Sequence, residues 1–221
     1  MSTLTSLTLA EELLLVALDD ERGTLLPLPP FSMEVASAAA LVMDLTLLGR
    51  IDTDEQSLTV ISTAPTGNAL LDEVLAQIAA DSATRRPTAD WMNRLATGTE
   101  TRDRIIAALV QRGVLQSVEK RLLWVFKTRV YPPTSGLEER EVKSRVMTLL
   151  NNEEIPDPRD SLLVGLLRGT TLLDALLSRS ERHRLSARID QIADFEELNR
   201  SMSRTIGELQ ILLAAANMGM A

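Results

Sequence analysis

The stretch from residue 162 to residue 177, LLVGLLRGTTLLDALL, restricts the fold more than any other part of this sequence. Apolar residues would cover nearly every side of a helix formed here, and such a helix is buried either in protein or in a membrane. Arg168 and Asp174 interrupt the stretch before it reaches the roughly 18 uncharged apolar residues of a membrane span. We therefore predict a buried central helix over residues 159–178, with both charges paired or at the edge of the core.

The composition favours other helices packed around that central one. Hydrophobic residues make up 45% of the 221 residues, but aromatic residues only 3%, so Leu, Ala, Val and Ile must build the core. Leu and Ala are better helix formers than strand formers. No long Gly/Ser linker divides the chain. We predict a mainly α fold in a single domain, residues 1–221, with small β-hairpins.

Periodicity and turn residues predict the remaining elements. Asn68 is placed to cap one helix, another contains Trp91, and a third ends at Gly113. Polar turns between short apolar runs predict hairpins near residues 50–61 and 114–131. Further helices are expected at about residues 7–19, 33–49, 137–152, 181–194 and 201–217.

The charge balance and the absence of cysteine exclude several kinds of site. Thirty-one acidic residues against 23 basic ones give a formal net charge of −8, which argues against broad nucleic-acid binding. Without cysteine there is no disulfide, thiolate nucleophile or cysteine-based metal site. The N-terminus lacks the pattern of a signal peptide. We expect a cytoplasmic protein that can still touch the cytosolic face of a membrane.

A helix, a glycine turn and a hairpin follow one another twice, around residues 33–61 and 99–131, and this order resembles a winged helix. A winged-helix-like nucleic-acid-binding or regulatory protein is therefore the alternative function. The helix of the first unit carries only Glu34 and Asp44 as charges, so it would make a poor recognition helix, and we do not expect a nucleic-acid partner. The second unit carries the cations Arg102, Arg104, Arg112, Lys120, Arg121, Lys127 and Arg129.

The sequence contains little that points to catalysis. His183 is the single histidine and lies in a highly charged segment, which is typical of a surface residue. There is no nucleophile elbow, Walker loop or dinucleotide fingerprint. The adjacent pairs Glu11–Glu12 and Glu138–Glu139 point to different sides of a helix and cannot act together. We expect a non-enzymatic protein with no catalytic residue, cofactor or metal site.

Arg102 is the best candidate for binding an anion. It lies in the first turn of its expected helix, directly after the capping-box pattern Thr97-Gly98-Thr99-Glu100. An arginine at a helix N-terminus can bind a phosphate group, although it can also pair with a neighbouring acid. Arg104, two residues further on, is a second candidate.

The second hairpin is unusually apolar for an exposed feature. Taken as one strand, RLLWVFKTRVY places Leu122, Trp124 and Phe126 on one face and Leu123 on the other, together with cations. A turn is expected just before it, at residues 118–121. Such a hairpin suits a protein partner or a lipid interface.

Four motifs occur in a fixed order: LTLAEELLLVALDDERG, LLGRI, APTGNALLDEVL and LVQRGVL. In this order and spacing the chain resembles the Golgi phosphoprotein 3 family over nearly its whole length. The resemblance implies a mainly helical fold around a hydrophobic central helix, with a protruding hairpin. It also implies a peripheral adaptor that binds phosphatidylinositol 4-phosphate.

By position, the family's lipid-binding tryptophan falls near Pro29, with Phe31 as the closest aromatic residue, and an arginine falls on Ala38. A pair of arginines falls near Thr99 and on Arg102, so only Arg102 is kept. The resemblance therefore implies weakened binding of an anionic phospholipid headgroup, with Arg102, Arg104 and Phe31 as candidates. It also implies that the hairpin at 116–127 contacts a membrane or a second subunit, and we favour a homo-oligomer formed through Leu122, Leu123, Trp124 and Phe126.

Overall fold

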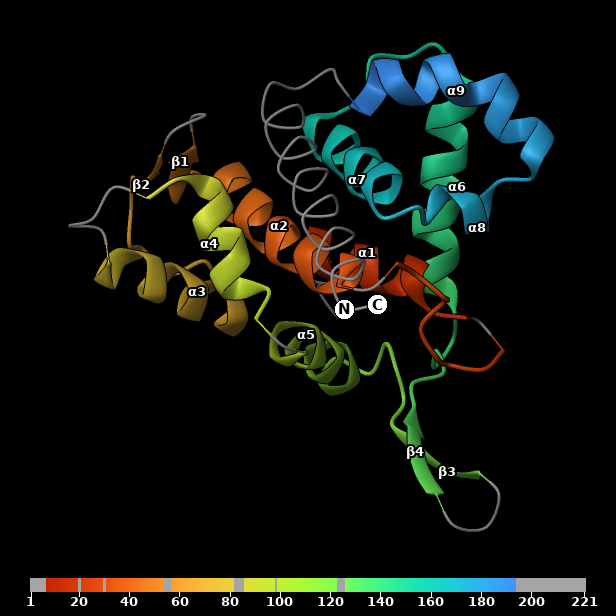
Figure 1. Ribbon diagram of the computed structural model, residues 1–221, viewed down its shortest axis with the longest axis horizontal. Helices are drawn as coiled ribbons and strands as arrows, with labels where there is room; N and C mark the ends of the chain where they lie inside the picture. The colour runs from red at the N-terminus through yellow and green to blue at the C-terminus, as the bar shows by residue number, and fades with distance from the viewer. Residues whose placement is uncertain are drawn as a thin grey trace, which may run out of the picture.

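A computed structural model of the chain describes residues 7–19, 21–29, 31–53, 57–81, 86–97, 99–122 and 126–193. Its architecture is mainly helical, as predicted, with two antiparallel hairpins (Figure 1). The helix expected at 201–217 lies outside the described residues. The elements are α1 Leu9–Ala17, α2 Ser32–Leu47, β1 Ile51–Thr53, β2 Leu58–Val60, α3 Ala69–Ala80, α4 Thr88–Leu95, α5 Glu100–Gln111, β3 Val118–Leu122, β4 Phe126–Val130, α6 Leu137–Asn151, α7 Pro158–Gly169, α8 Leu173–Leu176 and α9 Arg179–Ala193.

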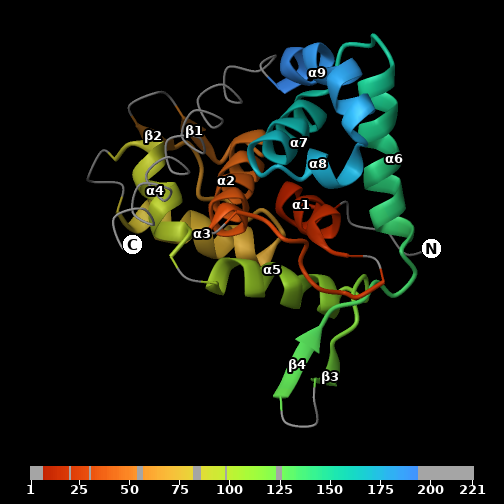
Figure 2. The same cartoon turned by 45° about the vertical axis from the view of Figure 1, so that its right-hand side comes forward.

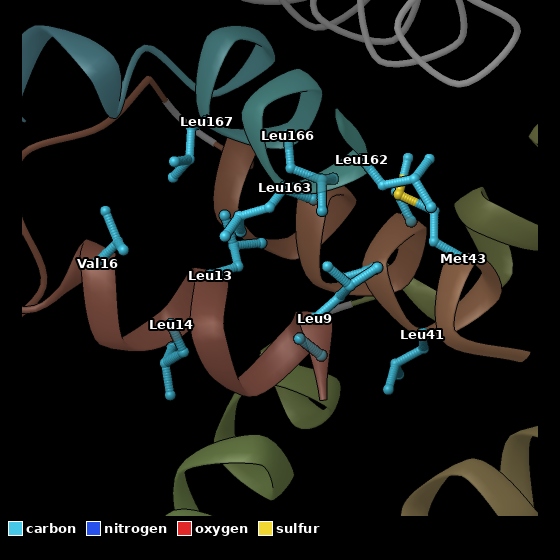
Figure 3. Close-up of a cluster of buried hydrophobic side chains, with 14 of the residues drawn as sticks. Leu9, Leu13, Leu14, Val16, Leu41, Met43, Leu162, Leu163, Leu166 and Leu167 are labelled. Carbon is cyan, nitrogen blue, oxygen red and sulfur yellow. The ribbon is translucent and has the colours of Figure 1, made fainter. Parts of the chain in front are cut away.

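Helix α1 lies at the centre of the core, and all nine of its residues are buried. Thr8 starts it with a complete capping box, because its hydroxyl accepts the Glu11 amide (3.1 Å) while the Glu11 carboxylate accepts the Thr8 amide (2.8 Å). Around α1 pack α2, α5, α6 and α7. Figure 3 shows α7 directing Leu163 and Leu166 toward α1 and α2. The buried hydrophobic residues form one contiguous cluster.

The predicted central helix is buried, but it is shorter than expected. Helix α7 ends at Gly169, Thr171 takes a left-handed conformation (φ 63°), and the short α8 follows. Thr170 helps to end α7, because its hydroxyl donates back to the Leu166 carbonyl (2.8 Å). The turn was missed because apolar residues continue on both sides of it, with Leu166 and Leu167 before it and Leu172 and Leu173 after it.

The two charges of this segment are paired, as predicted. Arg168 lies 3.0 Å from Asp190, and Asp174 lies 2.5 Å from Arg182. The two partners, Asp190 and Arg182, both belong to α9. The charges therefore help to hold α9 against α7 and α8.

Both hairpins form, but the turn of the second was predicted in the wrong place. In β1–β2, Ile51 pairs with Val60, and in β3–β4, Val118 pairs with Val130 and Leu122 with Phe126. The chain therefore reverses between Leu122 and Phe126, and residues 118–121 belong to β3. Apolar alternation continued across the reversal, so RLLWVFKTRVY was mistaken for one strand. Figure 2 shows β3–β4 projecting away from the helices, as the resemblance implied.

The root of the projecting hairpin is fixed to the turn after α1. The Tyr131 amide donates to the Gly23 carbonyl (2.6 Å), and the Gln116 amide donates to the Pro132 carbonyl (2.9 Å). Asp19 orders the turn by accepting the amide of Arg22 (2.8 Å). The end of the α1 motif thus supports the base of the hairpin.

Candidate functional site

Arg102 lies where the N-terminal ends of α5 and α2 meet. Its Nη1 is 2.8 Å from Oε1 of Glu34 in the first turn of α2, and its Nη2 is 3.2 Å from Oδ1 of Asp103. The Arg102 side chain is 20% exposed and that of Glu34 only 12%. The ion pair joins residues 68 positions apart, so the sequence pattern gave no sign of it. The partly buried guanidinium is already matched by acids, and an incoming anion must compete with Glu34.

Phe31 lies at the same end of α2 and has an unusual backbone. It is the N-cap residue, with φ 62° and ψ −3°, in the left-handed region that large side chains avoid. Its side chain is 52% exposed, so burial offsets little of this strain. Glu34, one turn along the helix, connects this end of α2 to Arg102.

Arg104 is directed elsewhere. It forms a bidentate pair with Glu73 of α3, and this hydrogen bonding holds the pKa of Glu73 below its usual value. The structure therefore brings Phe31 and Arg102 to one region but gives Arg104 a different partner. Arg104 therefore links α5 to α3 through this ion pair.

The expected capping box before Arg102 does not form. Thr99 is the N-cap of α5, but its hydroxyl donates to the Asp103 carboxylate (2.9 Å) and caps no amide. Ala38, the position to which the resemblance assigns an arginine, is fully buried within α2. Ala38 therefore offers no polar side chain to an anion, and the Thr99 hydroxyl is already bound to Asp103.

The candidate residues of the hairpin are described only in part. Leu122 and Phe126 end β3 and begin β4 as a directly opposed pair, and the structure describes their backbone. Leu123 and Trp124 lie outside the described residues.

The winged-helix interpretation gains no support from the first helix–hairpin unit. Helix α2 is buried along most of its length, from Met33 to Leu45, between α1, α4, α5 and α7. A recognition helix must present its side chains to the DNA groove. This helix belongs to the core.

Two of the four sequence motifs meet at Glu11 and Arg112. Glu11 of the first motif is buried, and its Oε2 lies 2.6 Å from Nη1 of Arg112 in the fourth motif. The same carboxylate completes the capping box of α1. The sequence analysis named no partner for either residue, although a Glu-Glu pair inside a strongly apolar run was a usable signal of a buried ion pair.

The other two motifs meet at Arg50, which sequence reasoning also missed. Its guanidinium donates to the carbonyls of Leu48 (2.8 Å), Ala64 (2.8 Å) and Pro65 (3.2 Å). Arg50 thereby fixes the loop that precedes α3, where Asn68 caps the helix through Leu70 and Leu71, as predicted. In the same loop, Asp72 accepts both the amide and the hydroxyl of Thr66, which lowers the pKa of Asp72.

A charge network also surrounds the N-terminal end of α1. Buried Glu12 lies 2.8 Å from Arg145 and 3.4 Å from Arg159, and Arg159 lies 3.5 Å from buried Asp44. Asp44 accepts the amide of Leu9 (3.0 Å). Burial raises the pKa of Asp44 to about 6, against the opposing effects of its backbone donors and Arg159. This network holds α2, α6 and α7 to α1.

The model of the Golgi phosphoprotein 3 family matches residues 9–209 of the chain. The chain belongs to the Golgi phosphoprotein 3 family. It is also similar to vacuolar protein sorting-associated protein 74 of Eremothecium gossypii, with 28% identity over 167 residues. The match covers 66% of this chain and 49% of that protein, so the chain spans about half the length of this curated relative.

In this chain, residues of the four motifs therefore form contacts that hold the fold together. Glu11 binds Arg112, and Arg50 binds the loop at Ala64–Pro65, whereas Arg102 lies outside both contacts. Within the described ranges no helix is long and apolar enough to cross a membrane. The same ranges contain no group of three or more acidic or histidine side chains that could hold a metal ion.

Proposed function

We propose that the protein is a non-enzymatic peripheral adaptor that binds an anionic phospholipid headgroup, similar to phosphatidylinositol 4-phosphate, at the surface formed by Phe31 and Arg102. Phe31 carries the proposal, because a large aromatic side chain is exposed and strained there with little burial to offset the strain. Strained residues that packing does not explain are enriched at binding sites. An aromatic ring beside a cation suits the boundary between headgroup and acyl chain.

Arg102 would supply the charge for the headgroup. A guanidinium in the first turn of α5 adds its donors to a helix N-terminus that already favours anions. Glu34 occupies one edge of that guanidinium, so binding requires exchange of a carboxylate for a phosphate. We expect weak binding that decreases strongly with salt.

Sedimentation with liposomes tests this function. Vesicles of phosphatidylcholine with and without phosphatidylinositol 4-phosphate should separate a specific headgroup contact from general adsorption. Arg102→Ala should reduce binding to the phosphoinositide vesicles about tenfold, through the loss of one charge-assisted contact, and Phe31→Ala should also reduce it, through the loss of an aromatic contact with the lipid. Arg104→Ala is the matched control, because Arg104 lies on the same helix but pairs with Glu73, and its binding should stay near wild type.

Glu34→Gln gives the opposite test, since it removes the competing charge but keeps the shape of the side chain. This variant should bind the phosphoinositide vesicles more tightly than the wild type. Equal loss of binding in the Arg102 and Arg104 variants would mean that general charge, and no site at Arg102, attracts the vesicles. Submicromolar, headgroup-selective binding that survives Arg102→Ala would place the site elsewhere.

The adaptor role draws on the family and on the relative's name, which associates that protein with vacuolar sorting. We propose a cytoplasmic location, with the protein held peripherally at the cytosolic face of a membrane. We also propose that it forms a homo-oligomer through the hairpin at 116–127. The projection of β3–β4 away from the helices supports this, since the two strands extend beyond the helical core, where a second subunit can reach them (Figures 1 and 2).

A further inference from the structure

In a groove between the end of α6 and the outer side of α9, two arginines direct their hydrogen bonds within the described residues to neutral oxygens. Nη2 of Arg184 donates to the Asn151 side-chain oxygen (3.1 Å), and Arg188 donates to the Gln191 side chain (3.0 Å) and the Glu154 carbonyl (2.5 Å). All three acceptors are neutral. Nε of Arg188 is inaccessible to solvent and has no acceptor among the described residues.

Several arginines of the helical core have carboxylate partners instead. Arg102, Arg112 and Arg145 each pair with at least one carboxylate, in a chain that has eight more acids than cations. Guanidinium groups bind carboxylates in preference to neutral oxygens, because charge-assisted hydrogen bonds are roughly twice as strong. The groove at Arg184 and Arg188 thus offers donors that an external carboxylate can satisfy.

The remaining lining indicates what kind of molecule would carry that carboxylate. The groove has a volume of about 660 Å³, and Leu150 and Leu185 form a buried apolar part of its wall. Beside it, Ile155 is 81% exposed, next to the Glu154 carbonyl that Arg188 holds. Side-chain amides, guanidinium groups and an apolar neighbour together suit a peptide segment with acidic and aliphatic residues.

The position of the groove favours a protein over a membrane as the source. Both views place α9 at the end of the molecule opposite the β3–β4 hairpin (Figures 1 and 2). In both views α5, which carries Arg102, lies on the hairpin side of the molecule, so a membrane bound at Arg102 would leave α9 facing away from the bilayer. We infer that the α6–α9 groove binds an acidic segment of a partner protein, with Arg184 and Arg188 receiving its carboxylates. Glu153 also lines the groove, and Glu181 on the same helix attracts Arg184, so both acids oppose the binding of a carboxylate.

The test uses the full chain and a fluorescein-labelled peptide of four glutamates around one leucine, followed by fluorescence anisotropy. The wild type should bind this peptide and should not bind the same peptide with lysines in place of glutamates. Arg184→Ala should weaken binding about tenfold, as expected for one charge-assisted contact at a partly exposed site. Glu153→Gln should strengthen it. Arg102→Ala should leave it unchanged, which keeps this result separate from the lipid-binding test.

Arg179→Ala is the matched control, because Arg179 is exposed on the same helix but does not line the groove. Its affinity should stay within about twofold of wild type, as for an isolated surface charge. Arg188→Ala should also lose peptide binding, but it removes the hydrogen bond that holds the α6–α7 connection. Circular dichroism must therefore show intact helices before this loss of binding is counted as support. Equal losses from Arg179→Ala and Arg184→Ala would overturn the proposal. The absence of detectable peptide binding by the wild type would also overturn it. If the wild type then bound phosphatidylserine vesicles and Arg184→Ala abolished that binding, the groove would be a lipid site instead.

Discussion

At the scale of single residues, Gly23 is needed both for its backbone angle and for its lack of a side chain. Its φ is +65°, and an added Cβ would lie 2.5 Å from the Pro132 nitrogen. Gly23→Ala should therefore lower the free energy of unfolding by more than the roughly 1–2 kcal/mol of left-handed strain alone. Gly67→Ala is the control, because Gly67 has φ +83° but open space around its Cβ position. Urea unfolding should rank Gly23→Ala as the more destabilised variant, and equal losses would mean that the contact with Pro132 is unimportant.

Asp44 makes stability depend on pH, because burial disfavours its charged form. The pKa of Asp44 rises from 3.8 to about 6 on folding, so its contribution to stability is complete below pH 4 and is lost as the pH rises through 6. Asp44→Asn removes this titration. Between pH 4 and pH 7 the wild type should lose roughly 3 kcal/mol relative to the variant. Urea unfolding of both proteins across this range checks it, and a constant difference at every pH would contradict it.

At the scale of elements, the break between α7 and α8 stores strain at Thr171. A β-branched residue with φ 63° costs roughly 1–2 kcal/mol of stability. Glycine at this position would remove that strain, but it would also make the unfolded chain more flexible, which offsets part of the stabilisation. Thr171→Gly should therefore stabilise the protein by about 0.5–1 kcal/mol. Thr170→Gly is the control and should destabilise it, because Thr170 is buried and its hydroxyl binds the Leu166 carbonyl. Thermal unfolding distinguishes the two, and a destabilised Thr171→Gly would show that the threonine makes a needed contact.

Local sequence patterns predicted most helices and strands, but they did not predict contacts between residues far apart in the sequence. The Asn68 cap, the glycine stop at Gly113 and the buried apolar helix all follow from neighbouring residues. The turn after Gly169 and the reversal after Leu122 were missed because apolar residues continue on both sides of each. At the candidate site, Arg102 could be named from its place on a helix, but its partner Glu34 belongs to another helix and no local pattern reveals it.

At the scale of the whole molecule, the projecting β3–β4 hairpin leads to a prediction about assembly. An aromatic anchor at an interface contributes about 2 kcal/mol or more, so Trp124→Ala should weaken the proposed homo-oligomer without unfolding the chain. Light scattering should give the wild type a mass above that of the 24.3 kDa chain and show Trp124→Ala shifting toward it. Trp91→Ala is the contrasting variant, because Trp91 is buried and its loss should reduce the helical circular dichroism signal. A wild type that remains monomeric at high concentration would contradict the prediction.

The pairing of the four motifs has a consequence for how sequences of this family diverge. Glu11 with Arg112, and Arg50 with the loop at Ala64–Pro65, maintain the scaffold whatever the protein binds. Relatives that lose the acid at position 11 should therefore also change position 112, so that the two positions covary. Position 102 lies outside these pairs, so we expect it to change, together with its partner at position 34, when the ligand changes. A search by motif thus recovers chains that inherit the scaffold, and under our proposal the bound molecule depends instead on position 102 and on the residues that face it.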